Sequence, residues 1–212
     1  MIRNMLVVVL LMMLVPCFAQ GITSGSDFVG VPTADVVAPG QVDLTVYSFG
    51  SGLPTAKRNN ESFRATVGIF DNLEVSANGS LEDIAMDNIF FGIKYAVDTA
   101  EAGYGWVKPA IFLYNIGDGR VGIPGVALSY DKPNSRFSTS IAGWKDDESW
   151  EAGIGADYYI GGGIRLIGEY GTKDSSAMAG LGLSYKWLKA RILKAEKDDW
   201  FIEAGINMPL WD

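Results

Sequence analysis

The sequence contains no histidine and only one cysteine, Cys17, among its 212 residues. Barrel phospholipases, acyltransferases and proteases of the familiar kinds use histidine as a general base, so their mechanisms are excluded. A zinc site would have to be built from carboxylates alone, and a disulfide within the chain is excluded. We therefore expect a protein that is not an enzyme and that holds no metal or cofactor.

Positive charge is also scarce, because 17 basic residues are set against 25 acidic ones and the formal net charge is −8. Nucleic acid binding needs a basic surface, so nucleic acid is excluded as a partner. After the first 15 residues the chain has no apolar run long enough for a membrane helix. These absences leave a soluble β domain or a closed barrel.

The first residues have the layout of a cleaved secretory signal. Arg3 precedes an apolar run from Met5 to Val15, and Pro16 is followed by a small-x-small site that ends at Ala19. This order predicts a signal peptide over residues 1–19, with cleavage after Ala19. The alternative is a lipoprotein cut before Cys17, which Pro16 disfavours.

Residues 20–39 form an N-terminal lead-in. Pro32 and Pro39 discourage a continuous helix or strand, and Pro39-Gly40 is typical of a turn into a first long strand. We expect this segment in the periplasm, either hanging free or tucked into the mouth of a barrel.

From residue 40 onward, segments of roughly nine to eleven residues alternate apolar and polar side chains, with Gly, Asp, Asn and Lys between them. About twelve such segments can be counted. The pattern predicts an all-β fold, a closed antiparallel transmembrane β-barrel over residues 40–212, with apolar side chains toward lipid. A soluble β-sandwich has the same alternation, but there the apolar faces meet each other.

The alternation also predicts hairpin registers. In "VGIFDNLEVSA" an apolar face is continuous if Val67 lies opposite Val75 and Ile69 opposite Leu73, with Asn72 left-handed in a three-residue loop. In "YIGGGIRL" the same logic places Ile160 opposite Ile164. In "SYDKPNSRF" a four-residue loop would place Asp131 opposite Arg136.

The other face of the strands carries the charged residues, which are expected to line the lumen. These candidates are Arg64, Glu74, Lys94, Lys108, Glu151, Asp157, Arg165, Glu169, Lys189, Arg191 and Glu203. Asp157 and Glu169 could form a carboxylate dyad, but salt-bridged networks are favoured because unpaired charges are costly in confined sites. The lumen of so small a barrel can be filled with water or with side chains, and both remain open.

All six tryptophans fall at the ends of predicted strands, where aromatic belts meet the membrane interfaces. The topology places Trp106, Trp187 and Trp211 at the periplasmic rim, and Trp144, Trp150 and Trp200 at the opposite rim.

Partners follow from the same topology. The closing segment "WFIEAGINMPLW" resembles the signal that the outer-membrane assembly machinery reads. Acidic loops at 117–120, 145–149 and 196–199 could bind divalent cations that bridge lipopolysaccharide, although solvated turns are the simpler interpretation. We therefore expect a protein of a Gram-negative outer membrane that contacts lipid, lipopolysaccharide and the assembly machinery.

Three stretches resemble the YjbH-type outer-membrane proteins as a set: "GVPTADVVAPGQVDLTVYSF" (30–49), "VGIFDNLEVSANGS" (67–80), and "FFGIKYAV" with "KPAIFLYNIGD" (90–97 and 108–118). The resemblance implies an outer-membrane barrel associated with exopolysaccharide production and a polysaccharide export system. It supplies no catalytic residues.

Two functions remain open from the sequence. The first is a small pore or accessory that transports small solutes or surface polysaccharide, selected by pore width and lining charge. The second is a non-conducting structural or assembly component of the outer membrane.

Overall fold

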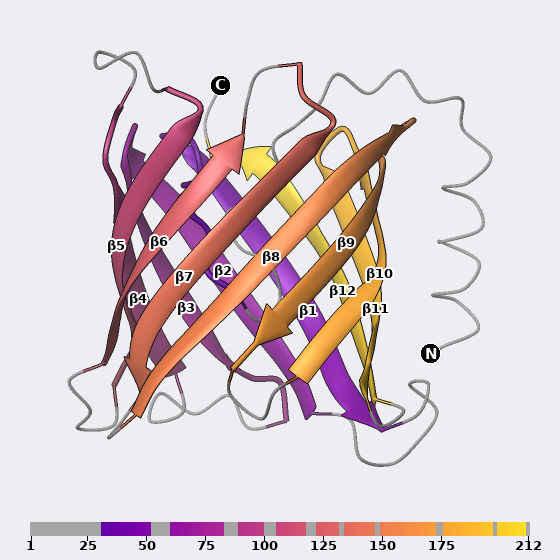
Figure 1. The fold of residues 1–212 in the computed structure, drawn as a ribbon. Coiled ribbons are helices and arrows are strands. Elements are labelled where there is room, and N and C mark those ends of the chain that lie inside the picture. Colours follow the sequence, from indigo (N-terminus) through magenta and orange to yellow (C-terminus); the bar gives the residue numbers. More distant parts are fainter. Residues whose placement is uncertain are drawn as a thin grey trace.

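The computed structural model describes residues 31–51, 60–82, 89–99, 105–117, 122–131, 134–146, 149–172, 176–196 and 199–210. These residues form twelve strands of one sheet that closes into a barrel (Figure 1). The strands are β1 (Gln41–Ser51), β2 (Asn60–Phe70), β3 (Leu73–Ser80), β4 (Ile89–Ala96), β5 (Val107–Ile116), β6 (Ile123–Asp131), β7 (Phe137–Asp146), β8 (Ser149–Gly161), β9 (Ile164–Gly171), β10 (Ser176–Tyr185), β11 (Leu188–Ala195) and β12 (Asp199–Pro209). The predicted signal peptide lies outside the described residues.

Every strand pairs antiparallel with its neighbours in the sequence, and β1 pairs with β12 to close the ring. Gln41 lies opposite Pro209 at one end of this seam, and Ser51 lies opposite Asp199 at the other. We call the end where β1 begins the terminal rim and the end where β1 finishes the distal rim. The closed antiparallel barrel of twelve strands is confirmed. A sandwich is excluded because the described strands contain no second sheet.

The outer surface of the barrel is apolar along the middle of its strands. Ile111, Val126 and Ile141 have exposed fractions of 58%, 57% and 54%, and Leu128, Leu166 and Leu181 are also exposed. A continuous apolar band of this kind is unfavourable in water, whereas hydrocarbon tails solvate it. The band therefore marks the barrel as membrane-spanning. No helix among the described residues is long and apolar enough to cross a bilayer.

The predicted registers hold in the strands and fail beside the turns. Val67 lies opposite Val75 as expected, but a bulge between Gly68 and Phe70 puts Phe70, and not Ile69, opposite Leu73. Asn72 is not left-handed, and it forms a two-residue turn with Asp71. The bulge leaves one residue of β2 without a partner and so keeps the apolar face continuous. The sequence pattern does not predict this bulge.

The β8–β9 hairpin repeats this solution. Gly161 lies opposite Ile164 and Tyr159 opposite Arg165, so Ile160 is the bulged residue rather than the partner of Ile164. In the β6–β7 hairpin, Asp131 lies opposite Ser138 and not opposite Arg136. That connection is longer than the predicted four-residue loop.

Gly163 ends the β8–β9 turn in a conformation that other residues avoid. Its φ is +81°, and an added Cβ would clash with the carbonyl oxygen of Ser184 on β10. We expect Gly163→Ala to lower the free energy of unfolding by about 1–3 kcal/mol, because the left-handed backbone and the clash act together.

Gly168→Ala is the matched control for this substitution. A Cβ on Gly168 would meet nothing within 4 Å. Urea unfolding of the two variants in lipid vesicles measures the difference. Equal stability of both variants would contradict the assigned turn.

Candidate functional site

The candidate site is the lumen, where alternate side chains of all twelve strands converge. Several charged side chains are buried inside the barrel, while their neighbours along each strand expose apolar side chains outside. The buried ones include Glu74, Lys94, Glu169, Lys189 and Glu203. Because successive side chains of a strand point to opposite faces, these residues share the inner face with the other predicted lumen candidates.

Lys94 on β4 and Glu74 on β3 lie directly opposite each other. The Lys94 Nζ is 3.0 Å from Glu74 Oε1, and the two side chains are 0% and 3% exposed. The second carboxylate oxygen, Oε2, accepts a 2.8 Å hydrogen bond from the backbone N–H of Val37. One carboxylate therefore ties two strands to the N-terminal lead-in.

A second network joins β1, β11 and β12 across the seam that closes the barrel. Arg191 donates two hydrogen bonds to the Glu203 carboxylate, from its Nε to Oε1 at 2.9 Å and from its NH2 nitrogen to Oε2 at 3.0 Å. Lys189 lies 2.8 Å from Asp43 Oδ1 and 3.8 Å from Glu203 Oε1. Asp43 also accepts a 2.7 Å hydrogen bond from the Thr45 hydroxyl.

Asp43 is a lumen residue that sequence reasoning missed. The signal for it was present, since Asp43 alternates with the outward Val42 and Leu44 in the first strand. The structure shows its role as the counter-ion that closes the seam.

A third group lies toward the terminal rim. Arg165 is 2.7 Å from Asp157, which also accepts a 2.7 Å hydrogen bond from the Ser138 hydroxyl. The structure therefore pairs Asp157 with a base and a hydroxyl, and gives no support to a catalytic dyad with Glu169. Lys108 lies 2.8 Å from Asp35 of the lead-in, and both side chains are about one-third exposed.

The remaining lumen candidates are also placed. Glu151 accepts hydrogen bonds from the hydroxyls of Ser149 and Thr172 near the distal rim. Arg64 is half-buried, and Glu169 is 5% exposed. Among the described residues, no group of three or more acidic side chains is arranged to hold a metal ion. The acidic loops at 117–120, 145–149 and 196–199 lie partly outside the described residues.

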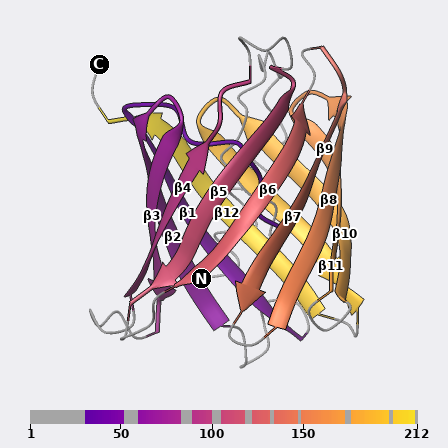
Figure 2. The same cartoon turned by 60° about the vertical axis from the view of Figure 1, so that its left-hand side comes forward.

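Residues 31–39, which we call the inner segment, run inside the barrel. In Figure 2 the indigo chain ahead of β1 passes behind β5 and β6, within the ring of strands. The backbone N–H of Ala34 donates to Ser129 Oγ at 2.7 Å, Ser129 donates to Ser140 Oγ at 3.1 Å, and Ser140 donates to the carbonyl of Pro32 at 3.0 Å. Wall hydroxyls thus satisfy buried backbone groups that water would otherwise solvate.

An apolar layer fills the lumen beside the inner segment, which the polar-in pattern did not predict. Val31 and Ala34 pack in one buried cluster with the inward side chains Ala96, Ala110, Phe112, Ala127, Ala142, Ile167, Leu193 and Phe201. The charged candidates therefore surround a partly apolar interior.

Among the described residues, one cavity in the lumen has a volume of about 90 Å³ and another of about 100 Å³. The first is lined by Asp131, Arg165 and Ser184 near the terminal rim. The second is lined by Arg64, Asn78 and Asn115 toward the distal rim. They share no lining residue, and each has room for several waters. The described residues thus leave a lumen divided by the inner segment and the apolar layer.

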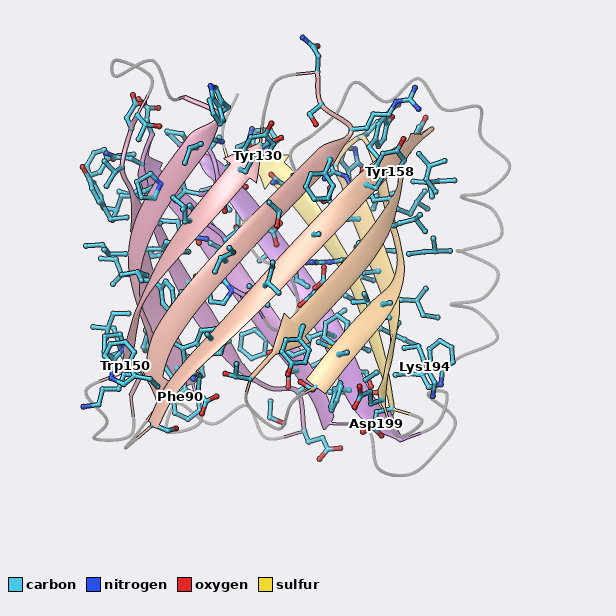
Figure 3. All side chains as sticks on the ribbon, viewed as in Figure 1. Phe90, Tyr130, Trp150, Tyr158, Lys194 and Asp199 are labelled. Carbon is cyan, nitrogen blue, oxygen red and sulfur yellow. The ribbon has the colours of Figure 1, made fainter. Side chains whose placement is uncertain are left out.

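The tryptophans do not all face outward. Trp106 and Trp187 are exposed at the terminal rim, with fractions of 37% and 51%, and Trp150 is 74% exposed at the distal rim. Lys194 Nζ lies 5.2 Å from the Trp200 ring centre. In Figure 3, Trp150 and Lys194 lie at the opposite end from Tyr130 and Tyr158.

Trp144 corrects the predicted belt. Its side chain packs against the buried cluster inside the barrel. The reason is parity, because Trp144 shares its face of β7 with the buried Ser140 and Ala142. A position at a strand end does not decide which face a side chain takes. Trp211 lies outside the described residues.

Comparison with solved structures finds barrels of the outer membrane. The chain is similar to the KdgM porin, with 12% identity and a TM-score of 0.50 over 78% of this chain and 97% of that chain. The KdgM porin in complex with disordered oligogalacturonate gives 12% identity and a TM-score of 0.50 over 79% and 97%. The outer membrane protein Omp33 of Acinetobacter baumannii gives 10% identity and a TM-score of 0.48 over 80% and 97%.

At such low identity these likenesses concern the fold alone. No protein-family model matches the sequence, and no curated protein matches it.

Proposed function

We propose that this protein is a narrow pore of the outer membrane through which small hydrophilic solutes diffuse. The observation that carries the proposal is a closed barrel with an apolar outer wall and an inner wall of charged side chains around two cavities. A polar lumen within a lipid-facing barrel is what passage of hydrated solutes requires. The fold shared with the KdgM porin supports it.

The inner charges argue against a strongly acidic solute such as the oligogalacturonate of the KdgM complex. Lys94, Lys108, Arg165, Lys189 and Arg191 each have a carboxylate partner within 3.0 Å. A polyanion would have to compete with those carboxylates for every base. We therefore propose neutral solutes and small cations as the transported class.

A second candidate function is a non-conducting structural or accessory component beside a polysaccharide exporter. The divided lumen favours it, as does the resemblance of residues 30–49, 67–80, 90–97 and 108–118 to the YjbH-type family. In either function, lipid, lipopolysaccharide and the outer-membrane assembly machinery are the proposed partners, and the outer membrane is the proposed location.

Planar-bilayer recording of the purified protein separates the two candidates. We expect discrete channel openings of small conductance, because the inner segment narrows the lumen. In a KCl gradient the reversal potential should be displaced toward the K⁺ equilibrium potential, with K⁺ several times more permeant than Cl⁻, because acids outnumber bases among the inner charges once Asp35 and Asp43 are included.

The folded state of the sample is checked by heat-modifiable gel mobility. Persistent silence of folded protein at all voltages would replace the pore with the accessory role. Openings that select Cl⁻ would keep the pore and contradict the proposed solute class.

A further inference from the structure

The inner segment is attached to the wall in a way that differs from every strand of the barrel. An isolated β-bridge joins Pro39 to Gly68, whereas each strand pair is held by a ladder of at least five aligned residue pairs. Pro32 and Pro39 lack the N–H that a longer ladder would need. The described part of the segment is thus held by separate contacts rather than by a ladder.

The contacts between the inner segment and the wall can break without leaving a buried charge away from both water and a counter-ion. When Val37 leaves Glu74, the carboxylate keeps Lys94 at 3.0 Å. When Asp35 leaves Lys108, the ammonium can be hydrated, because the Lys108 side chain is 36% exposed. Ser129 and Ser140 keep the hydrogen bond to each other.

The barrel itself does not depend on the inner segment. β1 begins at Gln41, after the segment ends, and its ladder with β12 runs the full length from Gln41 to Ser51. Detachment of residues 31–39 therefore breaks no strand pairing. Detachment also unpacks Val31 and Ala34 from the buried cluster, and local opening of this kind can occur at a free-energy cost below that of global unfolding.

The wall is shaped to receive the segment at one close approach. A Cβ on Gly68 would clash with the carbonyl oxygens of Val37 and Ala38. The backbone of β2 and that of the inner segment can meet at this position only because residue 68 is glycine.

From these observations we propose that residues 31–39 are a gate that closes the lumen when docked and opens it when detached from the wall. The latch consists of the Glu74, Ser129 and Lys108 contacts with Val37, Ala34 and Asp35. This inference rests on the proposed pore function, which supplies the passage that the gate controls.

A reversible covalent lock tests the gate. Ala34→Cys and Ser129→Cys are combined in a Cys17→Ser background. The Ala34 nitrogen lies 2.7 Å from Ser129 Oγ, which brings the two Cα atoms into the range of about 4.4–6.8 Å that a disulfide spans. Loss of free thiols on oxidation confirms that the lock has formed, and a short bifunctional thiol reagent replaces it otherwise.

We expect the oxidised double variant to be silent in planar bilayers and to open again in the same membrane on reduction. Each single cysteine variant, treated with the same oxidant, is the matched control and should not be silenced, because one cysteine cannot form the disulfide between residues 34 and 129. Openings of unchanged frequency in the locked protein would overturn the gate and leave the pore standing.

A second variant tests the gate in the opposite direction. Gly68→Ala should raise the open fraction on the order of tenfold, the factor that corresponds to loss of a hydrogen bond to a charged group such as the Val37–Glu74 bond. Gly168→Ala is its control, because a Cβ there meets nothing within 4 Å. An unchanged open fraction in folded Gly68→Ala would count against the gate.

A labelling readout keeps failure of the gate distinct from failure of the pore. Ala34 is 0% exposed, so a water-soluble thiol reagent should modify the single variant Ala34→Cys only while the segment is detached. Modification of Ala34→Cys without any conductance would contradict the pore function but would still show that the inner segment detaches. Conductance without modification would overturn the gate alone.

Discussion

Lys94→Met should destabilise the barrel more than either Ile141→Arg or Gly163→Ala. The substitution keeps the volume of the side chain but leaves the Glu74 carboxylate, 3% exposed, without its ammonium partner. Removal of one member of a buried ion pair costs about 3–5 kcal/mol, because the remaining charge has lost both water and counter-ion. We expect a loss of this size in the free energy of unfolding, measured by urea titration in lipid vesicles.

Two further variants separate the pair from the lysine alone. In Lys94→Met/Glu74→Gln the buried charge is gone, while the Gln amide oxygen can still accept the hydrogen bond that Val37 donates to Glu74. Most of the lost stability should therefore return. Lys145→Met is the control, since Lys145 is exposed at the end of β7. A single Lys94→Met variant as stable as the control would mean that water reaches this pair.

Ile141→Arg should be the second most damaging change. Ile141 lies in the middle of β7 on the apolar outer surface, with an exposed fraction of 54%. An arginine facing lipid near the bilayer midplane costs about 2–4 kcal/mol in barrels of this kind. We expect a loss of that size in the free energy of unfolding, measured in vesicles.

The same substitution at the rim is the matched control for Ile141. Ile160 is 47% exposed but lies beside the β8–β9 turn, where the cost of arginine falls to about 0–1 kcal/mol. If both variants lose equal stability, the cost does not depend on depth, and the apolar band is not in contact with hydrocarbon. Wild-type protein that stays folded in buffer without detergent would lead to the same conclusion.

The hairpins show how far local pattern extends. Alternation placed Val67 opposite Val75 correctly, because a one-residue slip would send a whole apolar row into the lumen. It failed at Ile69 and Ile160, where a bulge takes up one residue beside the turn. When a bulge is allowed, hairpins with different loop lengths keep the same apolar and polar strand faces. The alternation of side chains therefore cannot predict which loop length the hairpin adopts.

The inner wall shows the same limit. Alternation identified the bases that form ion pairs in the lumen, but it did not identify all of their partners. Asp43 joins Lys189 across the closing seam, and Asp35 joins Lys108 from a segment with no periodicity at all. Contacts across a closed ring depend on strand tilt and stagger, which no window of a few residues contains.

The amino-acid sequence by itself determined the two faces of this protein: an apolar one for lipid and a charged one for the interior. That follows from the two-residue period of a strand, a local property that needs no knowledge of the partners. Only the tertiary structure decided that the lumen is divided and that residues 31–39 lie against Glu74, Ser129 and Lys108. These arrangements arise when the ring closes and brings residues far apart in the chain within hydrogen-bond distance.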